Sequence, residues 1–371
     1  RVMNEDVLVK LPGEQPLRGV RVLELATVLA GPLAGSFWAG LGAEVIKVER
    51  PGRGANAGDV TRSWRAKGEA TEGPSAYYAA ANFGKTVVRK DLSTSDGQNW
   101  LEGMLGEVDL VVQNFRPESA GRMGLDFSGW CKRFPRLIHI QLLGFLHEPE
   151  RSAYDVLVQA EAGYMSMNGE AEGPPLRMPV ALMDVLAAHQ MQGAALAALF
   201  ARERSGRGAH IEVWLDAAAL AGLVNRASAT LMSGEDQHRM GSAHPQIAPY
   251  GDVFNTRDGS VVTAVGTDAQ FRGLCQLIGA ADKVQNARFS SNGERVNQRE
   301  ALLDYLAPHF AHLRTEDVLG SAREARVPLG EIRTVGQALA SQAGQSMLRT
   351  EMQDGMTTQR LSSLAFRMTS S

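Results

Sequence analysis

Asp184 is the residue of this chain that is best placed to act as a nucleophile. It follows the apolar run Met178-Pro-Val-Ala-Leu-Met183 and opens a long apolar helix that closes at Arg202-Glu-Arg-Ser-Gly-Arg-Gly208. The N-terminus of a helix stabilises an ionised carboxylate, and a carboxylate can form a covalent acyl intermediate. The alternative is an N-cap, in which Asp184 only satisfies the free backbone N–H groups at the helix start.

A second acid, Asp155, stands upstream in the stretch Ala153-Tyr-Asp155-Val-Leu-Val-Gln159. It follows the aromatic Tyr154 and could be structural, a general acid/base, or a group that positions the reacting atoms. The 8 histidines form no HxH or HExxH pattern, so we expect no metal site. No GxSxG sequence is present, which disfavours a serine hydrolase.

Two loops are typical of nucleotide binding. The first, Gly31-Pro-Leu-Ala-Gly35, follows a predicted strand and precedes a helix, and Glu49 lies where an acid would bind a ribose hydroxyl. Its spacing is not GxGxxG, and Pro32 breaks the tight phosphate turn, so a hydride-transfer cofactor is disfavoured. Arg50, beside Glu49, favours a ligand that carries extra phosphate.

The second loop, Asn114-Phe115-Arg116-Pro117, lies just past the end of a predicted strand, where open sheets bind ligands. Its asparagine offers amide hydrogen bonds and its phenylalanine offers a stacking face, while Arg116 and Arg122 can pair with phosphate. The alternative is a surface loop with solvated arginines.

The elements that must position these residues alternate between strands and helices. This alternation predicts an α/β fold, with a Rossmann-like open parallel sheet and helices on both faces. We expect strands at 20–25, 44–48, 86–89, 109–113, 137–142 and 210–214, and helices at 33–41 and 95–105.

The character of the chain changes after the glycine-rich end of the long helix. Residues 254–262 predict a hairpin with Asp258-Gly259 in its turn, and helices follow at 268–278 and 298–312. We therefore expect a large Rossmann-like nucleotide-binding domain over 1–224, a smaller α+β domain over 225–330, and a return of residues 331–371 to the first domain, with a late strand at 358–367.

Composition narrows the class of protein. With 371 residues and 44% hydrophobic residues the chain can bury a large core, and its net charge of −3 argues against nucleic-acid and membrane-surface partners. Polar groups such as Asp184 and His189 interrupt the most apolar stretch, 179–201, so we expect a buried helix rather than a membrane span. Cys131 and Cys275 are expected to be reduced thiols of a cytoplasmic protein.

These pieces, in this order, resemble the class III coenzyme A transferases, the family of formyl-CoA transferase, carnitine CoA-transferase and α-methylacyl-CoA racemase. The similarity covers about residues 17 to 335. The matching stretches are Leu17-Arg-Gly-Val-Arg-Val-Leu-Glu-Leu25, Leu29-Ala-Gly-Pro32, Leu41-Gly-Ala-Glu-Val-Ile-Lys-Val-Glu-Arg-Pro51, Asn114-Phe115-Arg116-Pro117, Gly121-Arg-Met-Gly-Leu125, Tyr154-Asp155, Asp184 and Ser205-Gly-Arg-Gly208.

The resemblance implies an enzyme that moves CoA from an acyl-CoA donor to a carboxylic acid acceptor. In that family the nucleophile is an aspartate, which Asp184 matches, and Asp155 falls where transferases carry a supporting acid. The loop with Gly241 and His244 falls where some members have a flap over the site. The positions that match the family's CoA-binding residues are Val28, Arg50, Lys90, Asn114, Phe115, Arg122 and Met123.

The resemblance also implies two interlocked chains in a homodimer, and CoA thioesters as substrates with no permanently bound cofactor. Family racemases have His-Asp where this chain has Tyr154-Asp155, which removes one of the two bases that α-proton exchange needs. Formyl-CoA transferases have a glutamine in place of Leu29 and a glycine run in place of Ser242-Ala-His244.

Three functions therefore compete: a CoA-transferase, which we favour, an acyl-CoA racemase or isomerase, and a nucleotide-binding module without chemistry. A small dicarboxylate such as succinate is the expected substrate type, with Arg151, Arg177 and His244 as candidates to pair its distal carboxylate.

Overall fold

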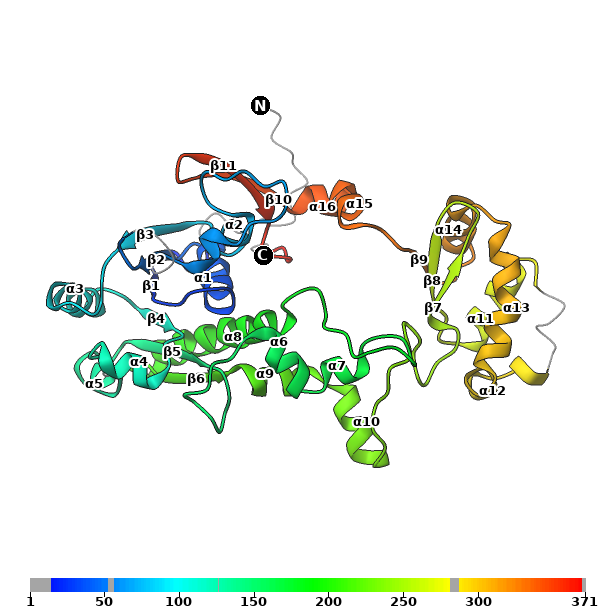
Figure 1. Cartoon of the computed structure of the whole chain (residues 1–371), viewed down its shortest axis with the longest axis horizontal. Coiled ribbons are helices and arrows are strands. Elements are labelled where there is room, and N and C mark those ends of the chain that lie inside the picture. The colour runs from blue at the N-terminus through cyan, green and yellow to red at the C-terminus, as the bar shows by residue number, and fades with distance from the viewer. Residues whose placement is uncertain (1–14, 53–56, 126, 281–286, 369–371) are drawn as a thin grey trace. The chain divides into compact units, whose positions relative to one another are not determined.

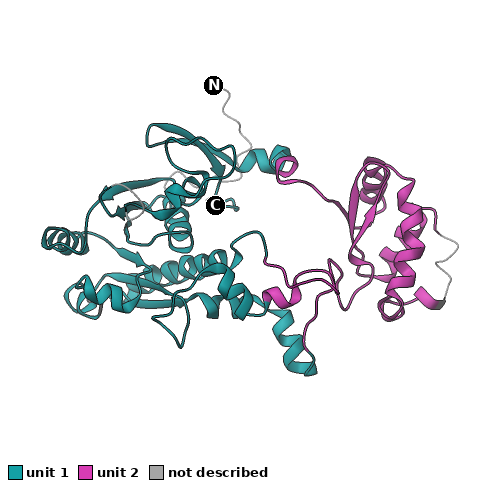
Figure 2. Cartoon of the chain, viewed as in Figure 1, with its two compact units in different colours: residues 1–163, 178–235, 339–371 teal, residues 164–177, 236–338 magenta. Residues whose placement is uncertain are grey.

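The computed structural model of the chain describes residues 15–52, 57–125, 127–280 and 287–368 (Figure 1). Contacts divide the chain into two compact units, which we describe separately (Figure 2). Unit 1 comprises residues 1–163, 178–235 and 339–371, and unit 2 comprises 164–177 and 236–338. The domain boundaries expected from the sequence stay a prediction.

Unit 1 is built on a six-stranded sheet in which every neighbouring pair is parallel. The strand order is β3-β2-β1-β4-β5-β6, the order of a Rossmann sheet, which confirms the predicted fold class. The strands are β1 (Arg21–Glu24), β2 (Glu44–Glu49), β3 (Lys85–Arg89), β4 (Leu110–Gln113), β5 (Ile138–Leu143) and β6 (His210–Trp214).

Helices connect these strands and cover the sheet. The longest, α8 (Leu182–Ser205), packs against α1 and against β5 and β6, and ends at Gly206, whose φ of 70° suits a left-handed cap. The other helical elements of unit 1 before its last segment are α1 (Ala30–Gly40), η1 (Val60–Ser63), α2 (Ala76–Ala81), α3 (Ser95–Leu105), α4 (Pro117–Arg122), α5 (Phe127–Arg133), α6 (Asp155–Glu161), α9 (Leu215–Gly222) and α10 (Asn225–Ser233).

One apolar core of unit 1 lies between the sheet and its covering helices. Side chains of β1, β2 and β4 pack against those of α3 and α5 in this core. These strands are nearly continuous runs of branched apolar residues, which is typical of strands in a buried parallel sheet. Central members are Leu23, Ile46, Leu101, Val111 and Trp130. The sheet is thus a rigid base, and the loops at its strand ends are free to carry function.

The last segment of the chain forms a hairpin in unit 1. It consists of β10 (Leu348–Gln353) and β11 (Met356–Leu361), which pair in antiparallel register. Short helices α15 (Val335–Ala340) and α16 (Gln342–Met347) precede it. The late strand expected at 358–367 therefore exists, but it begins earlier and ends at Leu361.

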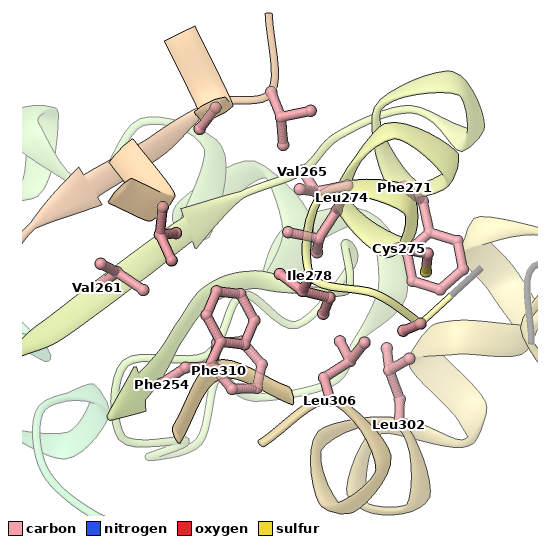
Figure 3. Close-up of a cluster of buried hydrophobic side chains, with 14 of the residues drawn as sticks. Phe254, Val261, Val265, Phe271, Leu274, Cys275, Ile278, Leu302, Leu306 and Phe310 are labelled. Carbon is pink, nitrogen blue, oxygen red and sulfur yellow. The ribbon is translucent and has the colours of Figure 1, made fainter. Parts of the chain in front are cut away.

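Unit 2 holds a three-stranded antiparallel sheet of β7 (Tyr250–Asn255), β8 (Ser260–Ala264) and β9 (Leu329–Glu331). The pairing of β7 with β8 confirms the predicted hairpin. Helices α11 (Asp268–Leu277), α13 (Arg299–Ala311) and α14 (Thr315–Glu324) pack apolar side chains onto this sheet, with Phe254 and Phe310 stacked on each other (Figure 3). Unit 2 also contains α7 (Tyr164–Met167), η3 (Ala287–Phe289) and α12 (Asn292–Asn297).

Candidate active site

The candidate site lies at the carboxyl ends of the parallel strands of unit 1, where the strand order reverses between β1 and β4. Asn114, directly after β4, bridges to the loop after β1. Its Nδ2 donates to the Thr27 carbonyl oxygen at 3.0 Å, and its Oδ1 accepts from the Thr27 N–H at 3.1 Å. Both ends of this amide are thus used to hold the loop in place.

The next residue of that loop, Val28, has a φ of 73°, in the left-handed region that a β-branched residue rarely adopts. Its N–H donates to the carboxylate of Asp59, with 3.2 Å to Oδ2. Asp59 is itself buried and ion-paired with Lys47, whose Nζ lies 3.1 Å from Oδ2. The surrounding structure therefore holds Val28 in a strained conformation, as is common beside functional sites.

Two lysines and two acids form a buried charged cluster behind this loop, and all four side chains are inaccessible to solvent. Lys47 Nζ also lies 3.0 Å from Glu24 Oε1, and Lys85 Nζ lies 2.7 Å from Glu24 Oε2. Burial lowers the pKa of Lys85 to about 8, whereas Glu24 and Asp59 outweigh burial at Lys47 and raise its pKa. The cluster compensates its charges internally and supports the 26–29 loop.

Asp184 is the third residue of α8 and faces the candidate site. The N-cap of this helix is Ala181, so the structure contradicts the N-cap alternative for Asp184. Burial, and next the charge of Asp155, raise the pKa of Asp184 to about 7. The N-terminus of α8 favours the ionised carboxylate, but burial and the charge of Asp155 have the larger effect on the pKa. A carboxyl group in a cleft with a strongly raised pKa is a candidate reactive group.

Asp155, the first residue of α6, is joined directly to the start of α8. Its Oδ1 accepts from the Met183 N–H at 2.8 Å, and its Oδ2 accepts from Gln159 Nε2 at 2.6 Å. Both carboxylate oxygens are thus occupied by donors. Among the three roles left open by the sequence, this geometry favours positioning over proton transfer.

A cleft of about 230 Å³ brings Asp155 and Asp184 together with the loops after β1 and β4. Its lining includes Val28, Asn114 and Phe115, which the sequence singled out, and Arg116, Arg151 and Tyr154. Burial, and then the charges of Asp184, Asp155 and Asp59, raise the pKa of the Tyr77 phenol on α2.

A second cleft, of about 410 Å³, adjoins the first, because Thr27 and Phe115 line both. Beside Phe115 it gathers the remaining residues predicted to bind CoA, namely Arg50, Lys90, Arg122 and Met123. Arg50 and Arg122 are exposed, and their ion pairs with Asp91 and Glu118 are solvated. Cations beside an aromatic and a thioether side chain suit a phosphorylated adenosine.

Glu49 is not placed to bind a ribose hydroxyl, a role that its position after the second predicted strand suggested. Its side chain is buried, accepts from Arg62 and from the Tyr78 hydroxyl at 2.7 Å, and lies 3.4 Å from Arg89. An acid with these partners has no free oxygen for a ligand, which further disfavours a dinucleotide cofactor.

Gly241 and His244 belong to unit 2 and are described within it. The His244 ring packs edge-on against Tyr250, and its Nδ1 accepts from the Gln246 N–H at 3.2 Å. Gly241 has a φ of 59° and donates its N–H to the Gly169 carbonyl oxygen at 2.9 Å. Their expected place over the site stays a prediction.

Three contributors to the site were missed by the sequence reasoning: Gln159, Tyr77 and Lys47. A lysine inside the apolar strand Glu44-Val-Ile-Lys-Val48 was a usable signal, because a buried lysine needs an acidic partner. Gln159 and Tyr77 carry no comparable signal, since each acquires its role from a contact across the fold.

Two further features of the described residues concern metal-binding clusters and membrane-spanning helices. Within the described ranges, no three or more His, Cys, Asp or Glu side chains lie close enough to hold a metal ion. In the same part of the chain, no helix is both long and apolar enough to cross a membrane.

Comparison with known proteins gives consistent matches. Residues 17–370 match the family model described as CoA-transferase family III. A succinate–glutarate CoA-transferase of Agrobacterium fabrum is 35% identical over 352 residues, covering 92% of this chain and 86% of the relative. The human succinyl-CoA:glutarate CoA-transferase is 32% identical, with 88% and 74% covered. A solved CAIB/BAIF family protein from Brucella suis superposes with a TM-score of 0.81 at 34% identity, with 94% and 92% covered.

Proposed function

This chain belongs to CoA-transferase family III, and from that premise we propose that it moves CoA between succinyl-CoA and a small dicarboxylic acid, with Asp184 as the nucleophile. That it is a CoA-transferase follows from the family and its relatives. The observation that carries the proposed chemistry is the Asp184 carboxyl, with its pKa raised to about 7, in a cleft that adjoins the basic and aromatic CoA-sized cleft.

The first half of the reaction consumes the donor. The ionised Asp184 carboxylate attacks the thioester carbonyl carbon, the carbon–sulfur bond breaks, and a mixed anhydride and CoA thiolate form. The thiolate then attacks the Asp184 carbonyl carbon of the anhydride. The donor leaves as a free carboxylate, and an aspartyl-CoA thioester remains.

The second half repeats these steps in reverse. The acceptor carboxylate attacks the aspartyl thioester, releases the thiolate and forms a new anhydride. Attack of the thiolate on the acceptor carbonyl gives the new acyl-CoA and regenerates the Asp184 carboxylate. No net proton, electron or metal ion is needed, in accord with the proposal that no cofactor is permanently bound.

Two observations support a dicarboxylate as the acid exchanged. The names of the two relatives given above specify succinate or succinyl-CoA, together with glutarate. In addition, Arg116 lines the cleft with Asp184 and donates to the Glu150 carbonyl oxygen at 3.3 Å, and within the described ranges no acidic side chain forms an ion pair with it. Arg151, one of the three residues first considered for this role together with Arg177 and His244, is ion-paired with Glu161 and Glu148.

Exposed apolar side chains support the proposed homodimer. Leu196 and Phe200 on α8, Leu220 on α9, and Leu231 and Met232 on α10 are all exposed in the single chain. Such a set is unfavourable in water and is typical of a surface that another chain covers. Light scattering after size exclusion tests this directly, and a monomer would contradict it.

We further propose a cytoplasmic location. Neither of the two cysteines, Cys131 and Cys275, takes part in a disulfide bond in the structure, as expected in a reducing compartment. Fractionation of the native host tests this proposal, and recovery of the protein outside the cytoplasm would contradict it.

The substrate proposal is tested by incubating the protein with succinyl-CoA and a panel of mono- and dicarboxylic acids. New CoA thioesters are detected by mass spectrometry, and we expect them for short dicarboxylates. Running the reaction in deuterated water tests the isomerase alternative, which requires α-proton exchange. Deuterium uptake without transfer would favour the isomerase, and transfer only to monocarboxylates would contradict the proposed acceptor class.

A further inference from the structure

The side chain of Gln159 is fully buried, one helical turn beyond Asp155 on α6. Its Nε2 lies 2.6 Å from Asp155 Oδ2, and 3.4 Å from the carbonyl oxygens of both Met178 and Val180. Its Oε1 accepts from the Met178 N–H at 2.7 Å. One amide thus joins the second acid of the site to the segment that leads into α8.

These contacts define the orientation of the amide. If its oxygen and nitrogen were exchanged, an oxygen would face the Asp155 carboxylate at 2.6 Å and an NH₂ group would face the Met178 N–H. Asp155 in turn accepts from the Met183 N–H, next to Asp184 in the chain. The contacts therefore form a continuous chain from Gln159 through Asp155 to the residue before the nucleophile.

We propose that Gln159 is a positioning residue for the reaction: it holds the Asp155 carboxylate aimed at the start of α8, and so controls the placement of Asp184 and the electrostatic environment in which Asp184 ionises. This inference rests on the proposed role of Asp184 as nucleophile. Gln159 itself touches no reacting atom and acts through Asp155.

The proposed effect on ionisation follows from simple electrostatics. The Gln159 amide places the positive end of its dipole against the Asp155 carboxylate, which weakens the negative potential that this carboxylate exerts on Asp184. Loss of the amide therefore strengthens the repulsion of an ionised Asp184, so Asp184 retains its proton to higher pH. The other titratable or charged groups that interact with the two acids or line their cleft are Tyr77, Asp59, Tyr154, Arg116 and Arg151.

The experiment measures the rate of adduct formation on Asp184 in a single turnover with succinyl-CoA, as a function of pH. For Gln159→Met we expect the inflection of this rate to move upward by about half to one pH unit, because only part of the value of the charge-assisted hydrogen bond to Asp155 is transmitted to Asp184. For Asp155→Asn we expect a downward shift, because a neighbouring negative charge is removed. In the double variant the shift caused by Gln159→Met should disappear.

A purely structural role would give a different result. If Gln159 only stabilised the fold, Gln159→Met would lower the rate at every pH without moving the inflection, or would shift it equally in the Asp155→Asn background. Either outcome overturns the proposal. The matched control is Gln353→Met, which removes an amide donor to the Asn82 carbonyl oxygen elsewhere in unit 1 and should leave the pH profile unchanged.

If Gln159→Met does not fold, Gln159→Glu serves instead, because it keeps the shape and replaces the donor by a second acid. We expect an upward shift larger than that of the methionine variant, and an unchanged inflection would overturn the proposal. Failure of the proposed function is distinguishable, because the wild-type protein would then form no adduct on Asp184 at any pH.

Discussion

Asp184→Asn should abolish CoA transfer and, at about pH 8, make the protein more stable. In the native protein, burial and the charge of Asp155 make the ionised Asp184 carboxylate unfavourable. Asparagine has nearly the same shape and no charge, so the substitution removes this cost. A reactive group that destabilises its own fold is expected at an active site.

The size of the expected gain in stability, and its dependence on pH, follow from the pKa of Asp184 in the native protein and its ordinary value. The native pKa is about 7 and the ordinary value is 3.8. The difference of about 3 pH units corresponds to at most about 4 kcal/mol of unfolding free energy. Loss of the favourable interaction with the N-terminus of α8 offsets about 0.3–1 kcal/mol of it. With partial solvent screening, we expect the variant to gain about 1–3 kcal/mol at about pH 8.

The sign of the effect is set by proton binding. Between pH 3.8 and about 7, native Asp184 keeps a proton that the unfolded chain has released, so wild-type stability from this group falls as pH rises through that window. Below that window both states are protonated and the advantage of Asp184→Asn should vanish. Above about pH 7 it should reach its plateau.

Urea unfolding followed by tryptophan fluorescence at about pH 4 and about pH 8 measures this difference. Asp96→Asn is the control, because Asp96 also lies in the first turn of a helix, α3, but is exposed. It should cost a few tenths of a kcal/mol, about the value of a charge at a helix end. A gain for Asp184→Asn that is equal at both pH values, or a loss at pH 8, would refute the reasoning.

Two further outcomes are expected. Lys47→Met should lower the unfolding free energy by about 3–5 kcal/mol, because it leaves buried Asp59 without its ion-pair partner; a loss below about 1 kcal/mol in urea unfolding would contradict the buried cluster. Arg122→Ala should raise the KM for the acyl-CoA about tenfold with little change in kcat, as loss of one phosphate contact implies. Arg133→Ala, which removes an exposed arginine paired with Glu102, should leave steady-state kinetics unchanged.

The parallel sheet could be predicted from the sequence because each strand is a short run of branched residues followed by a helical pattern. Residues 95–105 and 210–214 were assigned with the bounds that the structure gives to α3 and β6. The carboxyl ends of such strands meet at one edge, so the loop that begins at Asn114 could be assigned to a ligand-binding position. The local sequence pattern was sufficient to predict the sheet, since the strand register and the handedness of the crossover connections are common to folds of this type.

The inner organisation of the site could not be predicted in the same way. The charge balance of Lys47 depends on Asp59, which comes from a loop outside the sheet, and the bond from Asp155 to the Met183 N–H joins two separate helices. The buried environment of Glu49 could not be predicted for the same reason, since Arg62 and Tyr78 enclose it only in the folded chain. Such contacts are set by tertiary packing, which leaves no periodic trace in the sequence.

The central claim is that Asp184 carries the acyl and CoA groups during transfer. Wild-type protein incubated with succinyl-CoA alone, trapped with hydroxylamine, digested and analysed by mass spectrometry tests it most directly. We predict a hydroxamate on the carboxyl of Asp184, and no such product from Asp184→Asn. Full CoA transfer with Asp184 unmodified, or by the Asp184→Asn variant, would contradict the account.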